Sequence, residues 1–307
     1  MKRYGGIYFI FFLYCSIQSM PLKELFINQF NIDYVSTEHF AYCALKKKPL
    51  PFDIPYVAIP WAPFITYRRL DEIPDIKVPG GFTVCQHLHY KAILPVLRKM
   101  GVSVLFATHA DQDTHYKGVN YNDITVVPFP HYAMNGAQPA KIKDIYYSFI
   151  GFISHPVRKR IFSMRHLDNA YIKKRGNWHF YANHSEFSNE YKDVLARSRF
   201  SLCIRGAGVS TIRFWESLQA GAIPVLIADG MLLPDFINWD ECIIRVPEKD
   251  IEKIPGILAS IPFEKEQTMR KKCISIYKKH FSKENFAATI YHFFNKTMKN
   301  SSCNPSV

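Results

Sequence analysis

The amino-acid sequence predicts an α/β protein made of two facing Rossmann-like lobes, and three observations lead to this fold class. From about residue 52 onward, short apolar strands alternate with helical stretches, which is typical of parallel sheets covered on both faces. The chain has 307 residues, 48% of them hydrophobic, which is enough for two domains. The segment Pro128–Ala140 carries three prolines and a glycine with little periodicity, which indicates a connector between two such units. Ligands are therefore expected at the carboxyl ends of the strands, in a cleft between the lobes.

Composition excludes several classes of protein. The apolar fraction excludes global disorder, and 14 glycines and 19 prolines without a repeat exclude a collagen-like chain. No apolar run reaches the ~20 residues that span a bilayer. Seven dispersed cysteines without a C-x-x-C pair argue against a disulfide scaffold and a structural zinc site.

A net charge of +13, from 39 Lys and Arg against 26 Asp and Glu, indicates an anionic partner. The candidates are a nucleotide, a polyanionic glycan, a nucleic acid and a membrane surface. A nucleic acid ranks last, because the sequence has neither a basic recognition helix nor an aromatic stacking motif.

Residues 1–19 have the order of a secretory signal or short anchor. Lys2 and Arg3 precede the apolar stretch Ile7–Cys15, and cleavage is expected after Ser19. The alternative is a buried first strand of a cytoplasmic domain. Localisation is therefore secretory or membrane-associated through this segment, or else cytoplasmic.

The N-terminal, acceptor-side lobe is expected over residues 20–144. A helix over Tyr90–Met100 should stop at Gly101. The expected strands of this lobe are Leu22–Ile27, Tyr56–Ile59, Phe82–Cys85, Val102–Thr108 and Ile124–Val127.

The C-terminal lobe is expected over residues 145–285, followed by a C-terminal helix and tail over 286–307. The expected strands are Tyr146–Ile150, Trp178–Tyr181, Arg199–Ile204, Ala222–Ala228 and Cys242–Val246. The expected helices are Val157–Leu167, Glu190–Ala196, Thr211–Ala220, Ile251–Ser260, Glu264–Lys279 and Lys283–Lys299. The last helices are interpreted as core packing; a basic surface for peripheral membrane association is the alternative.

The most informative stretch is a strand, a glycine-containing turn and the start of a helix. The strand ends at Arg205, and Gly206 and Gly208 form a turn whose backbone N–H groups can approach phosphate oxygens. Ser210 is expected as the N-cap of the helix. Arg205 can grip a diphosphate in bidentate fashion. Because no Gly-Lys-Ser/Thr follows, an ATP-type P-loop is excluded.

Arg213 and Glu216 are three residues apart and share one face of this helix, whereas Phe214 and Leu218 lie on a buried face. A carboxylate on the polar face can accept hydrogen bonds from ribose hydroxyls. The alternative interpretation is an ordinary turn followed by an exposed ion pair.

The block Phe200–Trp239 resembles the signature of the exostosin family, glycosyltransferase family forty-seven. The resemblance rests on matches in register over forty residues. They are Arg205-Gly206, Ser210, Arg213, Glu216, Ala220-Gly221, Ile223-Pro224-Val225, Asp229-Gly230, Leu233-Pro234 and Trp239. Upstream, Tyr147–Gly151 with Val157-Arg158 is similar to the strand-plus-arginine segment of the family. The chain departs from the pattern at Ile204, Ser217 and Ala222, none of which removes a charged group.

The resemblance implies a GT-B-type fold whose C-terminal lobe binds a UDP- or GDP-linked nucleotide sugar and whose N-terminal lobe binds a glycan or polysaccharide acceptor. It further implies transfer with inversion, without a metal or a cofactor. The expected donor-site residues are Arg158, Arg205, Gly206, Gly208, Ser210, Arg213 and Glu216. A non-catalytic carbohydrate-binding protein on the same scaffold is the alternative.

An inverting transferase needs a general base, which is expected from the N-terminal lobe. His89 follows the strand that ends at Cys85, and His109 and Asp111 follow the next strand, so all three lie at strand carboxyl ends. His87 and Asp113 are close to them in sequence. Structural histidines and a metal site made by the same residues are the alternatives.

Overall fold

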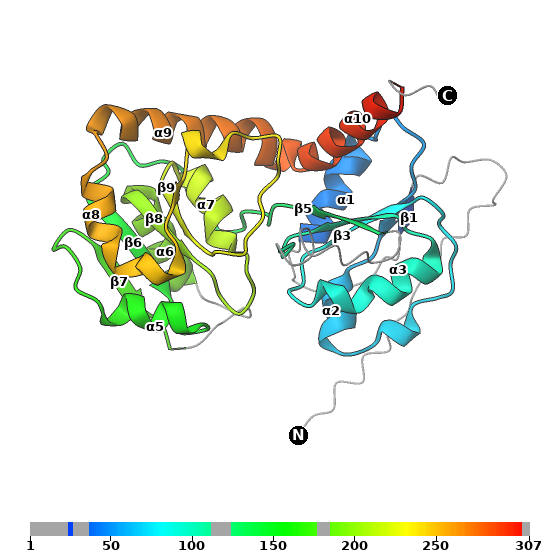
Figure 1. Cartoon of the computed structure of the whole chain (residues 1–307), viewed down its shortest axis with the longest axis horizontal. Coiled ribbons are helices and arrows are strands. Elements are labelled where there is room, and N and C mark those ends of the chain that lie inside the picture. Colours follow the sequence, from blue (N-terminus) through cyan, green and yellow to red (C-terminus); the bar gives the residue numbers. More distant parts are fainter. Residues whose placement is uncertain (1–23, 27–36, 112–123, 177–184, 303–307) are drawn as a thin grey trace.

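The computed structural model describes residues 24–26, 37–111, 124–176 and 185–302 and shows two α/β lobes side by side (Figure 1). Each lobe holds a five-stranded sheet in which every pairing is parallel. The predicted fold class is therefore confirmed. The signal-like residues 1–19, the expected strand Trp178–Tyr181 and Asp113 lie outside the described residues.

The sheet of the N-terminal lobe has the strand order β1-β2-β3-β4-β5. Its strands are β1 (Glu24–Phe26), β2 (Tyr56–Ala58), β3 (Phe82–Cys85), β4 (Val104–Ala107) and β5 (Thr125–Pro128). All coincide with expected strands to within a few residues. Thr108 and Phe129 follow β4 and β5, so the carboxyl ends of the central strands lie at one edge.

Helices cover both faces of this sheet because consecutive side chains along its central strands are buried and point to opposite faces in turn. Phe82 and Phe106 face α1 (Thr37–Lys47) and the C-terminal helix α10 (Ala288–Ser302), whereas Cys85 and Leu105 face the opposite layer. That opposite layer consists of α2 (Trp61–Thr66), η2 (Tyr90–Ile93) and α3 (Leu94–Met100). The helix expected over residues 90–100 is thus divided, since Pro95 stands in the first turn of α3.

The sheet of the C-terminal lobe has the order β10-β9-β8-β6-β7. Its strands are β6 (Ile145–Gly151), β7 (Tyr171–Lys174), β8 (Ser198–Ile204), β9 (Ile223–Ile227) and β10 (Ile244–Arg245). The chain leaves β6 toward β7 at one side and returns to β8 at the other. The strand order therefore reverses between β6 and β8, and such a switch point is where open α/β sheets bind ligands.

The helices of this lobe and its short turns surround the sheet. They are α5 (Pro156–Ser163), α6 (Ser185–Arg197), α7 (Ile212–Ala220), α8 (Ile254–Ala259) and α9 (Phe263–Ile276), with η3 (Trp239–Glu241) and η4 (Glu248–Lys253) between them. The remaining single turn of the N-terminal lobe is η1 (Leu70–Glu72). The strand β7, an edge strand with two lysines, was not expected from the sequence.

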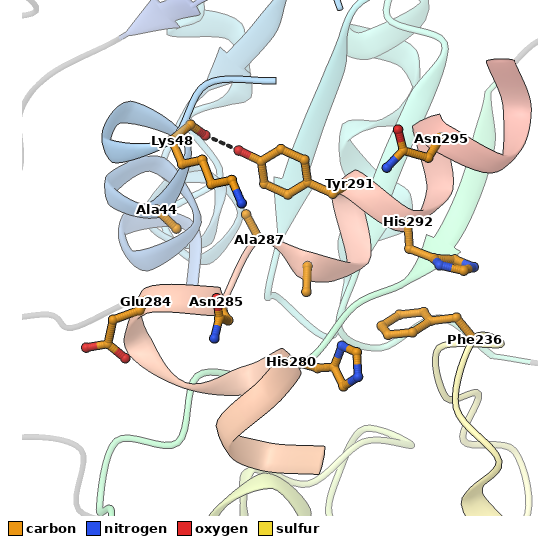
Figure 2. Close-up of a pocket in the computed structure, with 11 residues that line it drawn as sticks. Ala44, Lys48, Phe236, His280, Glu284, Asn285, Ala287, Tyr291, His292 and Asn295 are labelled. Atoms are coloured by element: carbon orange, nitrogen blue, oxygen red, sulfur yellow. Dashed lines mark hydrogen bonds between the residues drawn. The ribbon is translucent and has the colours of Figure 1, made fainter. Parts of the chain in front are cut away.

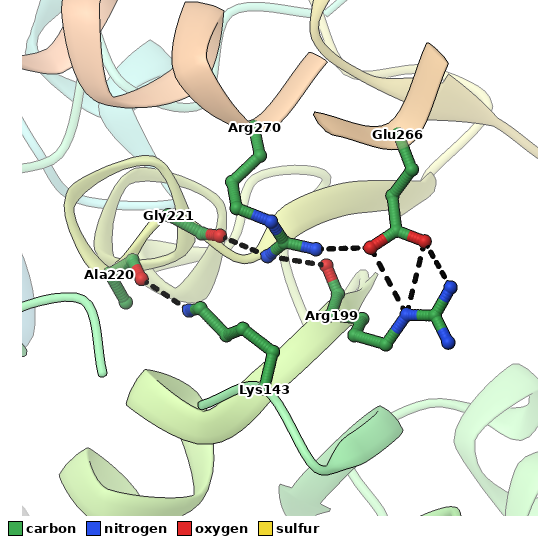
Figure 3. Close-up of polar contacts among 6 residues, drawn as sticks. All are labelled: Lys143, Arg199, Ala220, Gly221, Glu266 and Arg270. Carbon is green, nitrogen blue, oxygen red and sulfur yellow. Dashed lines mark hydrogen bonds and ion pairs between the residues drawn. The ribbon is translucent and has the colours of Figure 1, made fainter. Parts of the chain in front are cut away.

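Two basic side chains, the buried Arg270 and the half-buried Lys143, hold the C-terminal end of α7 (Figure 3). Lys143 Nζ donates a hydrogen bond to the Ala220 carbonyl at 2.8 Å, and Arg270 Nη1 donates one to the Gly221 carbonyl at 2.6 Å. Glu266, 1% exposed, pairs with both Arg270 and Arg199. Positive charge at a helix C-terminus is favourable, so this network fixes α7 from the end opposite the predicted site.

The C-terminal end of the chain returns to the N-terminal lobe. After α9 come a π-helical turn, η5 (Tyr277–Phe281), and η6 (Lys283–Asn285), and α10 then packs against the first sheet (Figure 1). The Phe294 ring lies 5.1 Å from the Phe82 ring and 6.0 Å from the Phe106 ring. The apolar side chains of this helix thus pack in a core. Within the described ranges, no helix is both long and apolar enough to cross a membrane.

Candidate functional site

The predicted turn between β8 and α7 lies at the switch point and rests on Arg158. This side chain is 9% exposed, and it donates hydrogen bonds to the carbonyls of Ile204 at 2.9 Å and Arg205 at 2.8 Å. Burial and the charge of Arg213 lower the pKa of Arg158 to about 9, so the guanidinium stays charged at neutral pH. Arg158, which the resemblance places among the donor-site residues, therefore binds the backbone where the turn begins.

Several buried donors around the turn have no hydrogen-bond partner within the described part of the protein. They are the Oγ atoms of Ser154 and Ser210, Nε of Arg205 and Nη1 of Arg213. Ser154 Oγ lies 3.2 Å from the position that a Cβ on Gly206 would take, so it faces the turn. Unsatisfied buried donors are costly in a folded protein, and a cluster of them with two arginines fits an anionic ligand.

Arg205 and Arg213 bring positive charge to this edge of the sheet. Arg205 Nη1 lies 3.7 Å from Glu248 Oε1, and the Arg205 side chain remains 23% exposed. Arg213 donates to the Ile150 carbonyl at the end of β6 and lies over the Phe149 ring, 4.4 Å from its centroid. Arg213 thus reaches the carboxyl end of β6, and Arg205 follows the carboxyl end of the neighbouring strand β8.

Ser210 does not cap α7 as expected. The N-cap is Thr211, and its side chain makes no capping hydrogen bond. Ser210 stands one residue earlier, is 6% exposed, and uses its backbone N–H to reach the other lobe. Ser210 and Thr211 are both suitable capping residues, and Thr211 takes the N-cap position because the helix begins at Ile212.

Glu216 is more enclosed than the sequence indicated. The side chain is 2% exposed; its Oε1 accepts from Asn135 N at 3.0 Å and from Asn135 Nδ2 at 3.1 Å, and its Oε2 accepts from Tyr191 Oη at 2.6 Å. The alternative of an exposed ion pair is therefore wrong for Glu216, because Tyr191 of α6 and Asn135 of the interdomain connector cover it. Phe214 and Leu218 are buried, as predicted.

Asn135 and Tyr191 were not expected from the sequence as partners of Glu216. Asn135 lies in the proline-rich connector, where residue pattern says nothing about contacts. Tyr191 lies on an expected helix, and its apolar body and terminal hydroxyl suit a buried carboxylate partner. Burial and the Glu216 charge raise the pKa of Tyr191 well above its usual value, so its hydroxyl remains a donor.

The histidine-rich loops of the N-terminal lobe contact this turn. A Cβ on Gly208 would lie 2.4 Å from His109 Nδ1 and 3.2 Å from the Leu88 Cβ, so glycine permits the approach. The Ser210 N–H donates to His109 Nδ1 at 3.3 Å. A β-bridge between Asp111 and Met231 joins the lobes nearby. The structure thus brings His109, Asp111 and the Gly206–Ser210 turn together.

The remaining candidates of this lobe differ in exposure. His89 is exposed, and its ring lies 5.4 Å from the His87 ring. Asp111 Oδ2 lies 3.4 Å from Lys91 Nζ. Neither the His87-x-His89 pair nor His109 and Asp111 belongs to a metal-binding cluster: in residues 24–26, 37–111, 124–176 and 185–302, no group of three or more His, Cys, Asp or Glu side chains is placed to hold a metal ion.

His109 is held neutral. Burial, together with the charges of His87, His89 and Arg205, lowers its pKa to about 4, and Asp111 opposes the shift. His131, from the connector, packs edge-on against it with the ring centroids 5.1 Å apart, and burial lowers the pKa of His131 well below its ordinary value. Two neutral histidines therefore lie in the contact between the lobes.

A separate cavity of about 270 Å³ lies where α1, η5 and α10 meet the loop that carries Phe236 (Figure 2). The Phe236 ring stacks on His292 at 4.5 Å and meets His280 edge-on at 5.3 Å. Lys48 and Tyr291 close another side. This cavity shares no residue with the predicted site.

Comparison with known families and proteins gives a consistent assignment. The family model described as the exostosin GT47 domain matches residues 99–261. A probable glucuronosyltransferase of Oryza sativa subsp. japonica, Os01g0926400, is 27% identical over 291 residues, which cover 81% of this chain and 65% of the rice protein. The Exostosin-1 homolog of Caenorhabditis elegans is 36% identical over 90 residues, covering 29% of this chain and 24% of the worm protein.

A third relative is the probable glucuronoxylan glucuronosyltransferase IRX7 of Arabidopsis thaliana, 32% identical over 136 residues, covering 43% of this chain and 30% of that protein. This chain therefore spans less than two thirds of the length of these relatives. Among solved structures, the pneumococcal O-GlcNAc transferase GtfA in complex with UDP and GlcNAc superposes with a TM-score of 0.42 at 8% identity, covering 85% of this chain and 59% of that chain.

Proposed function

Because the chain belongs to the exostosin GT47 family, we propose that it transfers a sugar from a nucleotide-sugar donor to a hydroxyl group of a glycan or polysaccharide. The family assignment supports the class of enzyme. Inversion at the anomeric carbon, a UDP or GDP carrier, and catalysis without a metal or a cofactor are the finer parts of the proposal. Each needs its own test.

One observation carries the proposal: two arginines, and buried donors that have no partner among the described residues, lie around the turn that follows β8 at the switch point. Arg205 and the amides near Ser210 would bind the diphosphate, and Gly206 and Gly208 would let it approach the turn closely. Arg213 would add positive charge. Arg158 would hold the turn in place.

Glu216 remains the proposed ribose partner. Its carboxylate now accepts from Asn135 and Tyr191, so ribose hydroxyls would have to join or replace these donors. A carboxylate oxygen has more than one acceptor direction, which allows a further donor without loss of the present ones.

The general base is proposed to be His89 or Asp111. It would take the proton of the acceptor hydroxyl while the oxygen attacks the anomeric carbon. The bond from that carbon to the diphosphate oxygen would break, and the electron pair would leave with the diphosphate. His109 is the weaker candidate for the general base, because its Nδ1 accepts a hydrogen bond from the Ser210 N–H.

The first donor to test carries glucuronic acid, because the rice and Arabidopsis relatives are named glucuronosyltransferases. A sugar carboxylate adds a negative charge to the diphosphate. A site with Arg205 and Arg213, in a chain of net charge +13, suits such a ligand.

The test is a screen of nucleotide sugars read by nucleotide release, together with calorimetric titration of UDP and GDP. Arg205→Ala should abolish binding, and Arg165→Ala, an exposed arginine of the same lobe, should bind like the wild type. If the wild type binds neither UDP nor GDP, the proposed function is refuted. Glycan binding without nucleotide release under any donor would favour the carbohydrate-binding alternative.

A further inference from the structure

The contact between His109 and the turn has a direct bearing on how a donor would enter. The imidazole comes from the end of β4 in one lobe, and Ser210 stands just before α7 in the other. It lies against the turn so closely that only glycine fits at position 208, since a Cβ there would be 2.4 Å from Nδ1. The ring therefore covers the backbone that phosphate is proposed to approach.

The hydrogen bond assigns the tautomer of His109. The Ser210 N–H donates to Nδ1, so this nitrogen offers its lone pair and Nε2 carries the proton. Burial and three cationic or titratable neighbours, His87, His89 and Arg205, keep the ring uncharged. Asp111 is the acidic group facing it, and His131 packs against its edge.

The Ser210 amide is the same donor that the proposed function assigns to the diphosphate. A phosphate oxygen carries negative charge and is a stronger acceptor at a helix N-terminus than a neutral imidazole nitrogen. Both acceptors cannot occupy the one N–H with good geometry. Next to it, Ser210 Oγ is buried and has no hydrogen-bond partner in the described ranges, so the imidazole satisfies only one of the two donors of Ser210.

We propose that His109 is a placeholder for the donor diphosphate: it occupies the Ser210 amide while no donor is bound, joins the two lobes there, and is displaced when the nucleotide enters. This inference rests on the proposed function. It makes His109 a positioning residue that links donor binding to the contact between the lobes. It also means that the Nδ1 lone pair of His109 becomes available only after the donor has bound.

The test compares UDP and GDP affinities of the wild type, His109→Ala and His109→Asn by calorimetry. His109→Ala removes the competitor, so the nucleotide should bind about three- to tenfold more tightly, as expected for one hydrogen bond. The amide oxygen of His109→Asn can replace Nδ1 as the acceptor, and its affinity should return toward that of the wild type. His292→Ala, an exposed histidine of α10 that lines the separate cavity, is the matched control and should bind like the wild type.

A second readout does not depend on affinity. Nuclear magnetic resonance of the His109 ring should show its pKa rising toward the ordinary value when nucleotide is added, because the ring leaves its buried position. Equal or weaker nucleotide binding by His109→Ala, with an unchanged melting temperature, would overturn the placeholder while leaving the proposed function intact. Absence of nucleotide binding to every variant would overturn both.

Discussion

Replacing Glu216 by alanine should strongly destabilise the C-terminal lobe, because one buried carboxylate ties α7 to α6 and to the interdomain connector. Three donors reach this side chain, at 3.0, 3.1 and 2.6 Å, and only 2% of it is exposed. Hydrogen bonds to charged groups contribute about 1.5–3 kcal/mol each, and a donor left buried without a partner costs about 1–3 kcal/mol. Since these effects overlap, we expect the free energy of unfolding to fall by about 3–5 kcal/mol.

The variant Glu216→Gln keeps the shape of the side chain and removes its negative charge. The amide oxygen can accept from Asn135, and the amide nitrogen can donate to the Tyr191 hydroxyl, so stability should fall by only about 1 kcal/mol. If the carboxylate binds ribose, the same variant should lose about tenfold in UDP or GDP affinity, the usual scale for one charge-assisted hydrogen bond. Urea unfolding followed by circular dichroism measures the first quantity, and calorimetric titration measures the second.

A loss below about 1 kcal/mol in Glu216→Ala would refute the reasoning from hydrogen bonds. Equal destabilisation by alanine and glutamine would assign the effect to the negative charge beside Arg213 instead. Wild-type nucleotide affinity in Glu216→Gln would refute the ribose role.

Phe294→Ala should lower the free energy of unfolding of the N-terminal lobe by about 3–5 kcal/mol in urea titration, because it leaves a cavity under α10; no change would refute the packing. Acidification from pH 6.5 to 4 should cost up to about 3 kcal/mol in thermal unfolding, and less in His109→Ala. The reason is that unfolded His109 binds a proton there, whereas folded His109, with its pKa lowered to about 4, does not. Burial lowers the pKa of Lys143 to about 7, so stability should rise between pH 7 and 9 by up to about 1.4 kcal/mol per pH unit. This slope should vanish in Lys143→Met, and its persistence would assign it to another group.

The sequence predicted those elements whose apolar pattern is continuous. β3 coincides with the expected Phe82–Cys85, and β8, α7 and β9 lie within two residues of their expected bounds. The edge strand β7 was missed because Lys173 and Lys174 are exposed and give it no apolar period. The helix α1 was missed because its buried face includes small residues, such as Ala41 and Ala44, which make the apolar periodicity of the segment weak.

The candidate site was predicted as a set of residues and not as a set of contacts. Arg205, Gly208 and Ser210 meet at the switch point because they follow one another along the chain. The burial of Glu216 depends on Asn135, which is 81 residues away, and the occupation of the Ser210 amide depends on His109, 101 residues away. Contacts at such separations depend on how the connector and the lobes pack together, and the pattern of apolar and polar residues within one segment does not predict that packing.

The return of α10 to the first sheet has a consequence for biosynthesis. Phe82 and Phe106 are synthesised about 210 and about 190 residues before Phe294, the ring that covers them, so the first lobe cannot complete its core in the order of translation. The second lobe, whose hydrophobic core is complete by Phe281, is the earlier one to reach a closed interior. A chain truncated shortly after residue 281 and released from the ribosome should therefore resist proteolysis in its second lobe before its first.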